Sequence, residues 1–190
     1  MNESFYQDHS FRNLAFPEKE LIGKEFENCT FVQCDFSNAD FSKSELVDCV
    51  FENCNLSMAK VVGTSLKNVA FKHCKLVGVE FMDASDFLFT VSFDQCLLDF
   101  AGFSDKKMPG TVFNKCKMEQ TDFTNASLAQ AVFKNCDLLN AVFENTDLGK
   151  ADFRSSFNYV IDPEMNNIRK AKFSMDGVEG LLRKYELEIE

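Results

Sequence analysis

The sequence predicts an all-β solenoid, and three periodic features of the chain support this fold class. Large apolar residues recur at every fifth position, small residues lie two positions before them, and a longer period of twenty relates equivalent phenylalanines. A period of five matches neither the 3.6-residue turn of a helix nor the two-residue alternation of a strand. It matches a chain that turns a corner after each five-residue side, so that every fifth side chain points inward.

The five-residue register holds over most of the chain. Read in steps of five, sixteen positions over Tyr6–Phe81 and fourteen over Leu88–Phe153 are all large and apolar. The residue two positions before each large one is Cys, Ala, Ser, Thr or Val throughout Cys29–Val79. One large and one small inward side chain per side would fill a narrow interior at the packing density of a protein core.

The period of twenty shows how the sides close into coils. It aligns two sets of phenylalanines, which are Phe11, Phe31, Phe51 and Phe71, and then Phe93, Phe113, Phe133 and Phe153. Four sides of five residues make one coil, and stacked coils should lie about 4.8 Å apart, the spacing of paired strands. The step from 71 to 93 is 22, which predicts a two-residue bulge at about residues 82–88. We therefore predict one solenoid over residues 1–157 and a C-terminal module over residues 158–190.

Three segments carry a resemblance to a known family. Ala39-Asp40-Phe41-Ser42-Lys43, Cys136-Asp137-Leu138-Leu139-Asn140 and Ala151-Asp152-Phe153-Arg154 are similar to the A(D/N)LXX pentapeptide repeat. Over roughly residues 6–157 the chain resembles the pentapeptide-repeat family, which implies a right-handed quadrilateral β-helix. It is distantly similar to the quinolone-resistance and topoisomerase-protecting members of the Qnr, MfpA and McbG types.

The first coil departs from the pattern. His9, Leu14, Lys19 and Lys24 occupy its small inward positions. Terminal repeats of solenoids are atypical because they cap the stack. We therefore expect an irregular first coil.

All eight cysteines occupy the small inward position, and they are Cys29, Cys34, Cys49, Cys54, Cys74, Cys96, Cys116 and Cys136. The principal interpretation is that they serve as small buried apolar residues. The alternative is metal or redox chemistry, because the period of twenty would place several thiols one strand spacing apart, within disulfide range. No C-x-x-C pair supports that alternative, so no metal or cofactor is predicted.

The C-terminal module is predicted to contain a helix and a short strand. Ser174 is a favourable N-cap, and Glu186-Leu187-Glu188-Ile189-Glu190 alternates as an edge strand does. The exposed end of a solenoid must be covered, so this module is predicted to be a cap, a dimer interface, or both. Its candidate contact residues are Val178, Leu181, Leu182, Tyr185, Leu187 and Ile189.

The composition of the chain disfavours several classes of function. The formal net charge of −10 disfavours direct binding of nucleic acid or of an anionic membrane. No stretch is long and apolar enough to span a membrane, and the N-terminus lacks a signal-peptide pattern, so we expect a cytoplasmic protein. His9 and His73 are the only histidines and belong to different coils, and no catalytic motif surrounds them. The sequence therefore predicts a protein that is not an enzyme.

One irregular region is the candidate partner-binding site. Asp86 and Lys106 are charged residues at small inward positions, twenty residues apart, and they either pair or point outward. Aromatic and cationic residues near them are typical of binding anchors. The candidates are Phe87, Phe89, Phe100, Lys106 and Lys107.

Three functions follow from these patterns. The first is a non-catalytic scaffold that binds another protein on its outer surface. The second comes from the family resemblance, because some members are acidic rods that mimic DNA, occupy the DNA-binding groove of gyrase and other type II topoisomerases, and protect them against quinolones. The third is an acyltransferase built on a left-handed β-helix, which is disfavoured because that fold needs a period of six. Some family members dimerise end to end, so a homodimer through one end of the solenoid is also open.

Overall fold

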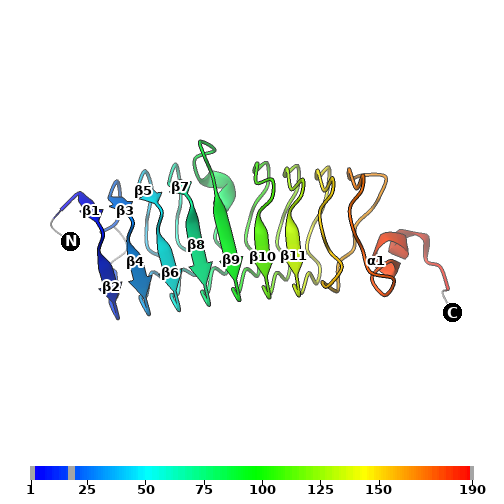
Figure 1. Ribbon diagram of the computed structural model, residues 1–190, viewed down its shortest axis with the longest axis horizontal. Coiled ribbons are helices and arrows are strands. Elements are labelled where there is room, and N and C mark those ends of the chain that lie inside the picture. Colours follow the sequence, from blue (N-terminus) through cyan, green and yellow to red (C-terminus); the bar gives the residue numbers. More distant parts are fainter. Residues whose placement is uncertain (1–2, 17–19, 189–190) are drawn as a thin grey trace.

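The computed structural model describes residues 3–16 and 20–188, and it forms one rod of stacked coils (Figure 1). Every described strand pair is parallel, and equivalent residues pair at a step of twenty, as in Phe31 with Phe51, except where Phe71 pairs with Phe93 at a step of 22. The fold class is therefore the predicted quadrilateral β-helix. The described part of the chain contains no helix long and apolar enough to cross a bilayer.

Two of the four faces carry the strands. Face A holds a four-stranded sheet made of β1 (Phe5–Gln7), β3 (Glu25–Glu27), β5 (Glu45–Val47) and β7 (Ser65–Lys67). Face B holds a seven-stranded sheet made of β2 (Ser10–Arg12), β4 (Thr30–Val32), β6 (Val50–Glu52), β8 (Val69–Lys72), β9 (Val91–Asp94), β10 (Val112–Asn114) and β11 (Val132–Lys134). Short parallel bridges extend face A from Lys107 to Asn167.

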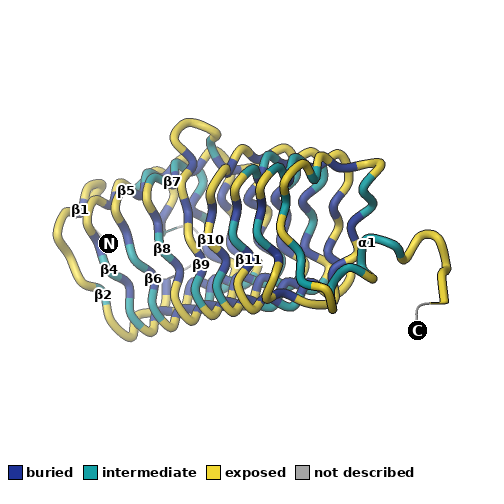
Figure 2. Tube along the Cα trace, turned by 45° about the vertical axis from the view of Figure 1, so that its right-hand side comes forward, coloured by how far each residue is buried: buried dark blue, intermediate teal, exposed yellow. Residues whose placement is uncertain are grey.

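The other two faces are held by isolated parallel bridges. Face C runs from Ala15 to Phe157, and face D runs from Asp40 to Val142. Because side chains alternate along each five-residue side, buried and exposed residues alternate in bands around the rod (Figure 2).

The interior is a ladder of aromatic rings. Along face B, rings stack from Phe11 to Phe173 at every coil, with centroids 4.6 to 5.4 Å apart and interplanar angles of 4° to 20°. The ladder includes Phe173, so the coils extend beyond residue 157, where the sequence placed the end of the solenoid. Asp152 also pairs with Lys172 in this last coil.

The eight cysteines are buried and free. Their thiols donate to backbone carbonyls, as Cys54 Sγ does to Phe31 O at 3.3 Å. Burial raises the pKa of the Cys49 thiol to about 12. Within the described residues no group of His, Cys, Asp and Glu side chains could hold a metal ion. These thiols therefore act as small packing groups.

The coil corners use the left-handed backbone region. Asn28 and Asn68 have φ of 49° and 53° there, a conformation that Asn tolerates better than most residues. Their amides donate to Asp8 Oδ1 and Asp48 Oδ1, each at 2.6 Å. At the N-terminal end of face A, the column of corner residues therefore alternates carboxylates and amides.

Two sequence expectations for chain segments need correction. Leu88, placed inward by the five-residue register, is 60 % exposed, while its neighbour Phe89 is buried. The expected terminal strand is absent at Glu186–Glu188, since Glu186 adopts a left-handed φ of 50° and ends a short helix. Glu190 and Ile189 lie outside the described residues.

Candidate functional site

The coil between β8 and β9 carries the largest interruption of the solenoid surface. The 3-10 helix η1 (Phe81–Asp83) leads into it, and the chain then projects above the neighbouring corners (Figure 1). Ala84 still fills the small inward position, and Phe89 fills the next large one. Residues 86–88 therefore form the excursion, which we call the 86–88 loop.

Lys106 holds this loop at its base. Its side chain is almost fully buried and its Nζ donates to Asp86 Oδ1 at 2.7 Å and to the carbonyl of Ala84. The ammonium also lies 5.2 Å from the centre of the Phe89 ring, an arrangement that favours a cation. Of the two sequence alternatives for Asp86 and Lys106, pairing is correct, with the lysine buried and the carboxylate exposed.

The tip of the loop is apolar and exposed. Phe87 is 68 % exposed and Leu88 is 60 % exposed. Lys67, which is ion-paired with Glu45, lies over the Phe87 ring with its Nζ 5.5 Å from the centroid. Local hydrogen bonds add order, because Phe87 N donates to Ser85 Oγ at 3.3 Å. The tip is thus a pre-ordered pair of apolar side chains above face A.

The predicted partner-binding residues differ in exposure and in the face on which they lie. Phe87 and Lys107 are exposed near one another in the fold, on face A. Phe89 and Lys106 are buried and are unavailable to a partner. Phe100 is 51 % exposed, but it lies at a corner of face C, on the opposite side of the rod.

Sequence reasoning missed Leu88 as a tip residue. The missed signal is the alternation of Phe89, Val91 and Phe93, all of which are buried. Extending that alternation backwards leaves Leu88 outside, although it would also place Phe87 inside, where the structure instead has the exposed 86–88 loop. The five-residue register hid it because Leu88 also fits that register when the solenoid is read from its C-terminal half.

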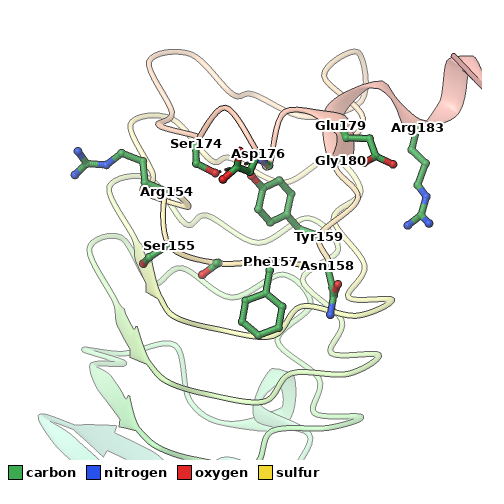
Figure 3. A pocket seen from close by; sticks show the side chains of 12 residues that line it. Arg154, Ser155, Phe157, Asn158, Tyr159, Ser174, Asp176, Glu179, Gly180 and Arg183 are labelled. Atoms are coloured by element: carbon green, nitrogen blue, oxygen red, sulfur yellow. Dashed lines mark hydrogen bonds between the residues drawn. The ribbon is translucent and has the colours of Figure 1, made fainter. Parts of the chain in front are cut away.

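Tyr159 closes the C-terminal end of the rod (Figure 3). Its ring lies 5.6 Å from Phe153 and 5.7 Å from Phe173, and burial raises the pKa of its hydroxyl. The cap packs tightly on it, since a Cβ on Gly177 would lie 1.9 Å from Tyr159 Oη. A hollow of about 520 Å³ remains between the cap and the last coil, beside Arg154 and Asn158.

The cap itself is short. Ser174 Oγ accepts from Gly177 N at 3.1 Å, and the turn leads into α1 (Glu179–Leu182) and η2 (Arg183–Tyr185). The candidate contact residues behave differently: Leu181 packs against the core, Val178 and Leu182 are half-buried, and Tyr185 and Leu187 are exposed. The predicted helix is present, but it begins at Glu179 with Val178 as the preceding residue, so the prediction of Ser174 as its N-cap is wrong.

Charge is segregated around the C-terminal half. Residues 101–160 contain seven acidic and seven basic residues, but the two signs lie on different faces. Faces C and D carry five of the acidic residues and one base, and these are Asp105, Glu119, Asp122, Asp137, Glu144 and Lys117. Faces A and B carry five exposed bases and two acidic residues, and these are Lys107, Lys115, Lys134, Lys150, Arg154, Asp147 and Asp152.

The fold and its filled interior define the class of the protein, a parallel β-solenoid built from five-residue sides. Two family models match the chain, "Pentapeptide repeat region" over residues 24–103 and "Pentapeptide repeats (8 copies)" over residues 116–154. The chain belongs to the pentapeptide-repeat family. A sequence search of curated proteins finds no match.

Two solved structures support the fold, and a third is more weakly similar. A trypsin-treated variant of QnrB1, a plasmid-mediated fluoroquinolone resistance protein, matches with a TM-score of 0.65 and 18 % identity, covering 98 % of this chain and 100 % of the other. A second trypsin-treated QnrB1 variant has a TM-score of 0.50 and 22 % identity, with coverage of 97 % and 99 %. HetL, a pentapeptide-repeat protein involved in heterocyst differentiation regulation in the cyanobacterium Nostoc, has a TM-score of 0.39 and 14 % identity, covering 90 % of this chain and 86 % of its own.

Proposed function

We propose that the protein is a non-catalytic scaffold that binds another protein through its outer surface. The observation that carries this proposal is the filled interior, which leaves the exterior as the working surface. The cavity inside the coils between Phe51 and Phe71 measures only about 20 Å³, far below the several hundred Å³ of ordinary small-molecule sites.

The 86–88 loop is the proposed anchor. Large exposed aromatic side chains on an ordered backbone bind with little loss of conformational entropy, and such residues dominate interface energies. Lys107, exposed beside the loop on face A, adds a cation at the rim. Phe87 and Leu88 would enter an apolar pocket of the partner.

A binding experiment on cell extract from the source organism tests this proposal. We expect affinity capture with the wild-type chain to retain a partner that the double variant Phe87→Ser and Leu88→Ser releases. Met58→Ser is a matched control, because Met58 is also 58 % exposed but lies on face C. Equal recovery of every protein by the loop variant and by the wild type would contradict the loop as an anchor.

A second candidate is the mimicry of DNA toward gyrase or another type II topoisomerase. The observation that favours it is the acidity of faces C and D, where burial beside Asp83 and Asp122 also raises the pKa of Glu80. Closely spaced carboxylates along a rod can occupy a basic groove that otherwise holds phosphates.

The test for mimicry is a supercoiling assay with purified gyrase. We expect inhibition, or protection from a quinolone, that weakens as salt rises from about 50 to 200 mM. Reversing two carboxylates, with Asp122→Lys and Glu144→Lys, should abolish the effect, whereas Glu25→Lys and Glu27→Lys on face A should preserve it. A wild-type chain without effect at high concentration would exclude this candidate.

We also propose the exposed end as the dimer contact. Tyr185 and Leu187 remain 49 % and 57 % exposed beyond the cap, and a second copy would cover them. Analytical ultracentrifugation of the wild type and of Leu187→Asp tests this contact. We expect a dimeric wild type and a monomeric variant, and a variant that is still a dimer would exclude the contact.

A further inference from the structure

Face A has a shallow hollow near its C-terminal end. The hollow measures about 380 Å³ and its lining includes two small residues and three cations, which are Ala129, Gly149, Lys150, Arg169 and Lys170. A Cβ on Gly149 would lie 3.2 Å from Asp147 Oδ1 and would narrow the space. Because Ala129 and Gly149 are small, the hollow stays open between the longer cationic side chains that line it.

The corner column of face A is built differently at its two ends. At the N-terminal end it alternates carboxylate and amide, as Asp8 with Asn28 shows at 2.6 Å. At the C-terminal end Lys150 stacks directly on Lys170, since Lys150 N donates to Arg169 O at 2.9 Å. Both lysines have φ of 60° to 62°, a conformation that costs such residues free energy.

This arrangement gathers positive charge that an anion could neutralise. Like charges directly opposite each other on neighbouring strands destabilise a sheet, and Arg169 adds a third charge of the same sign. Among the residues that the structure describes, none forms an ion pair or a hydrogen bond with the charged side-chain groups of these three cations. The charge they share is therefore uncompensated within the described fold.

The carboxylate in the hollow is already engaged. Asp147 Oδ1 accepts from Gly149 N at 3.1 Å and from Asn167 Nδ2 at 2.8 Å. Two hydrogen bonds thus hold this oxygen against the wall of the last two coils. The lining keeps an excess of positive charge, with three cations to one carboxylate.

We infer that this hollow binds a compact polyphosphate group, through Lys150, Arg169 and Lys170. Guanidinium and ammonium groups together suit phosphate, because Arg supplies a planar fork of donors and Lys supplies a point charge. The site is separate from the 86–88 loop and from the acidic faces C and D, so it does not depend on the function proposed above.

Calorimetric titration of inorganic tripolyphosphate into the full chain at about 50 mM salt tests the inference. We expect one bound tripolyphosphate per chain. The triple variant with Lys150→Ala, Arg169→Ala and Lys170→Ala should bind at least tenfold more weakly. A matched control with Lys43→Ala, Lys72→Ala and Lys75→Ala removes the same charge from exposed positions elsewhere and should retain wild-type affinity.

An equal loss in both triple variants would show that only overall charge matters and would overturn the site, as would an absence of binding to the wild type. If the triple variant does not fold, Lys170→Ala and the amide chemical shift of Gly149 provide the readout, and an unmoved Gly149 signal in the wild type would contradict the site. Titration with a nucleoside triphosphate distinguishes the source of the phosphates. Tighter binding than tripolyphosphate would support the site with a free nucleotide as ligand, and equal binding would support it with the phosphates alone as the recognised part.

Discussion

The regular coils and the interrupted coil at residues 81–90 solve the same packing problem in different ways. In a regular coil such as the one through Phe113, Cys116 and Phe123, large and small inward residues follow a fixed five-residue register. In the interrupted coil the excursion breaks the register, yet Ala84 and Phe89 still fill the interior. The comparison shows that this solenoid tolerates an excursion when the inward positions on both sides of it stay filled.

The stability of the regular coils should depend most on the aromatic ladder. Phe113 is fully buried and stacks on Phe93 and Phe133 at 5.3 and 4.9 Å. We expect Phe113→Ala to lower the free energy of unfolding by about 3–5 kcal/mol, because it removes apolar area and leaves a cavity. Urea unfolding measures this change. A loss below about 1 kcal/mol would show that the ladder relaxes around a gap.

The interrupted coil should depend on Lys106 instead. Lys106→Ala leaves the buried carbonyl of Ala84 and the carboxylate of Asp86 without this donor, and we expect a loss of about 1–3 kcal/mol. Lys106→Met keeps most of the buried stem, so it separates packing from hydrogen bonding. If the Met variant is as stable as the wild type, the ammonium contributes nothing net and the comparison between the two coils fails.

Cys49 should give the regular coils a pH-dependent stability. The pKa of Cys49 is raised from its ordinary value to about 12 by burial, so folding favours the protonated thiol. Its contribution is complete below the unfolded pKa of about 8.5 and is lost as the pH rises towards 12. We expect the melting temperature of the wild type to fall more than that of Cys49→Val between pH 8 and pH 10.5, and parallel curves would contradict this assignment.

The smallest effect on stability should come from the loop tip. Phe87 is 68 % exposed, so Phe87→Ser should change the free energy of unfolding by less than about 0.5 kcal/mol. Thermal unfolding measures this change. A large destabilisation would mean that the ring packs on Lys67 as part of the fold, and it would remove the reason for proposing a binding anchor.

Much of the fold could be predicted because the inward register is a property of the chain alone. The five-residue spacing alone predicts that Phe31 and Phe51 point inward, and both are buried. The end of the solenoid was predicted too early because Asn158 interrupts the register, while the fold fills the interior with Ile161 and resumes the register with Ile168 and Phe173. A single polar residue at a corner does not end a coil when the next inward residues still meet their neighbours.

The candidate site was only partly predictable for a related reason. The sequence marks Phe87, Phe89 and Lys106 as irregular, but it does not say which of them turn inward. That choice depends on the partner of the Lys106 ammonium, which comes from the preceding coil. Likewise, a net charge of zero over residues 101–160 hides the separation of signs, which appears only when the coils are stacked.

The step of twenty between paired residues has a mechanical consequence. Each coil contacts chiefly the coils above and below it, so a force applied to the two termini should peel the rod one coil at a time. Twenty extended residues span about 70 Å, so the unravelling trace should be a sawtooth of nearly equal teeth. The tooth that frees the coil containing the 86–88 loop should be longer by the two inserted residues, and this would locate the irregular coil from a pulling curve alone.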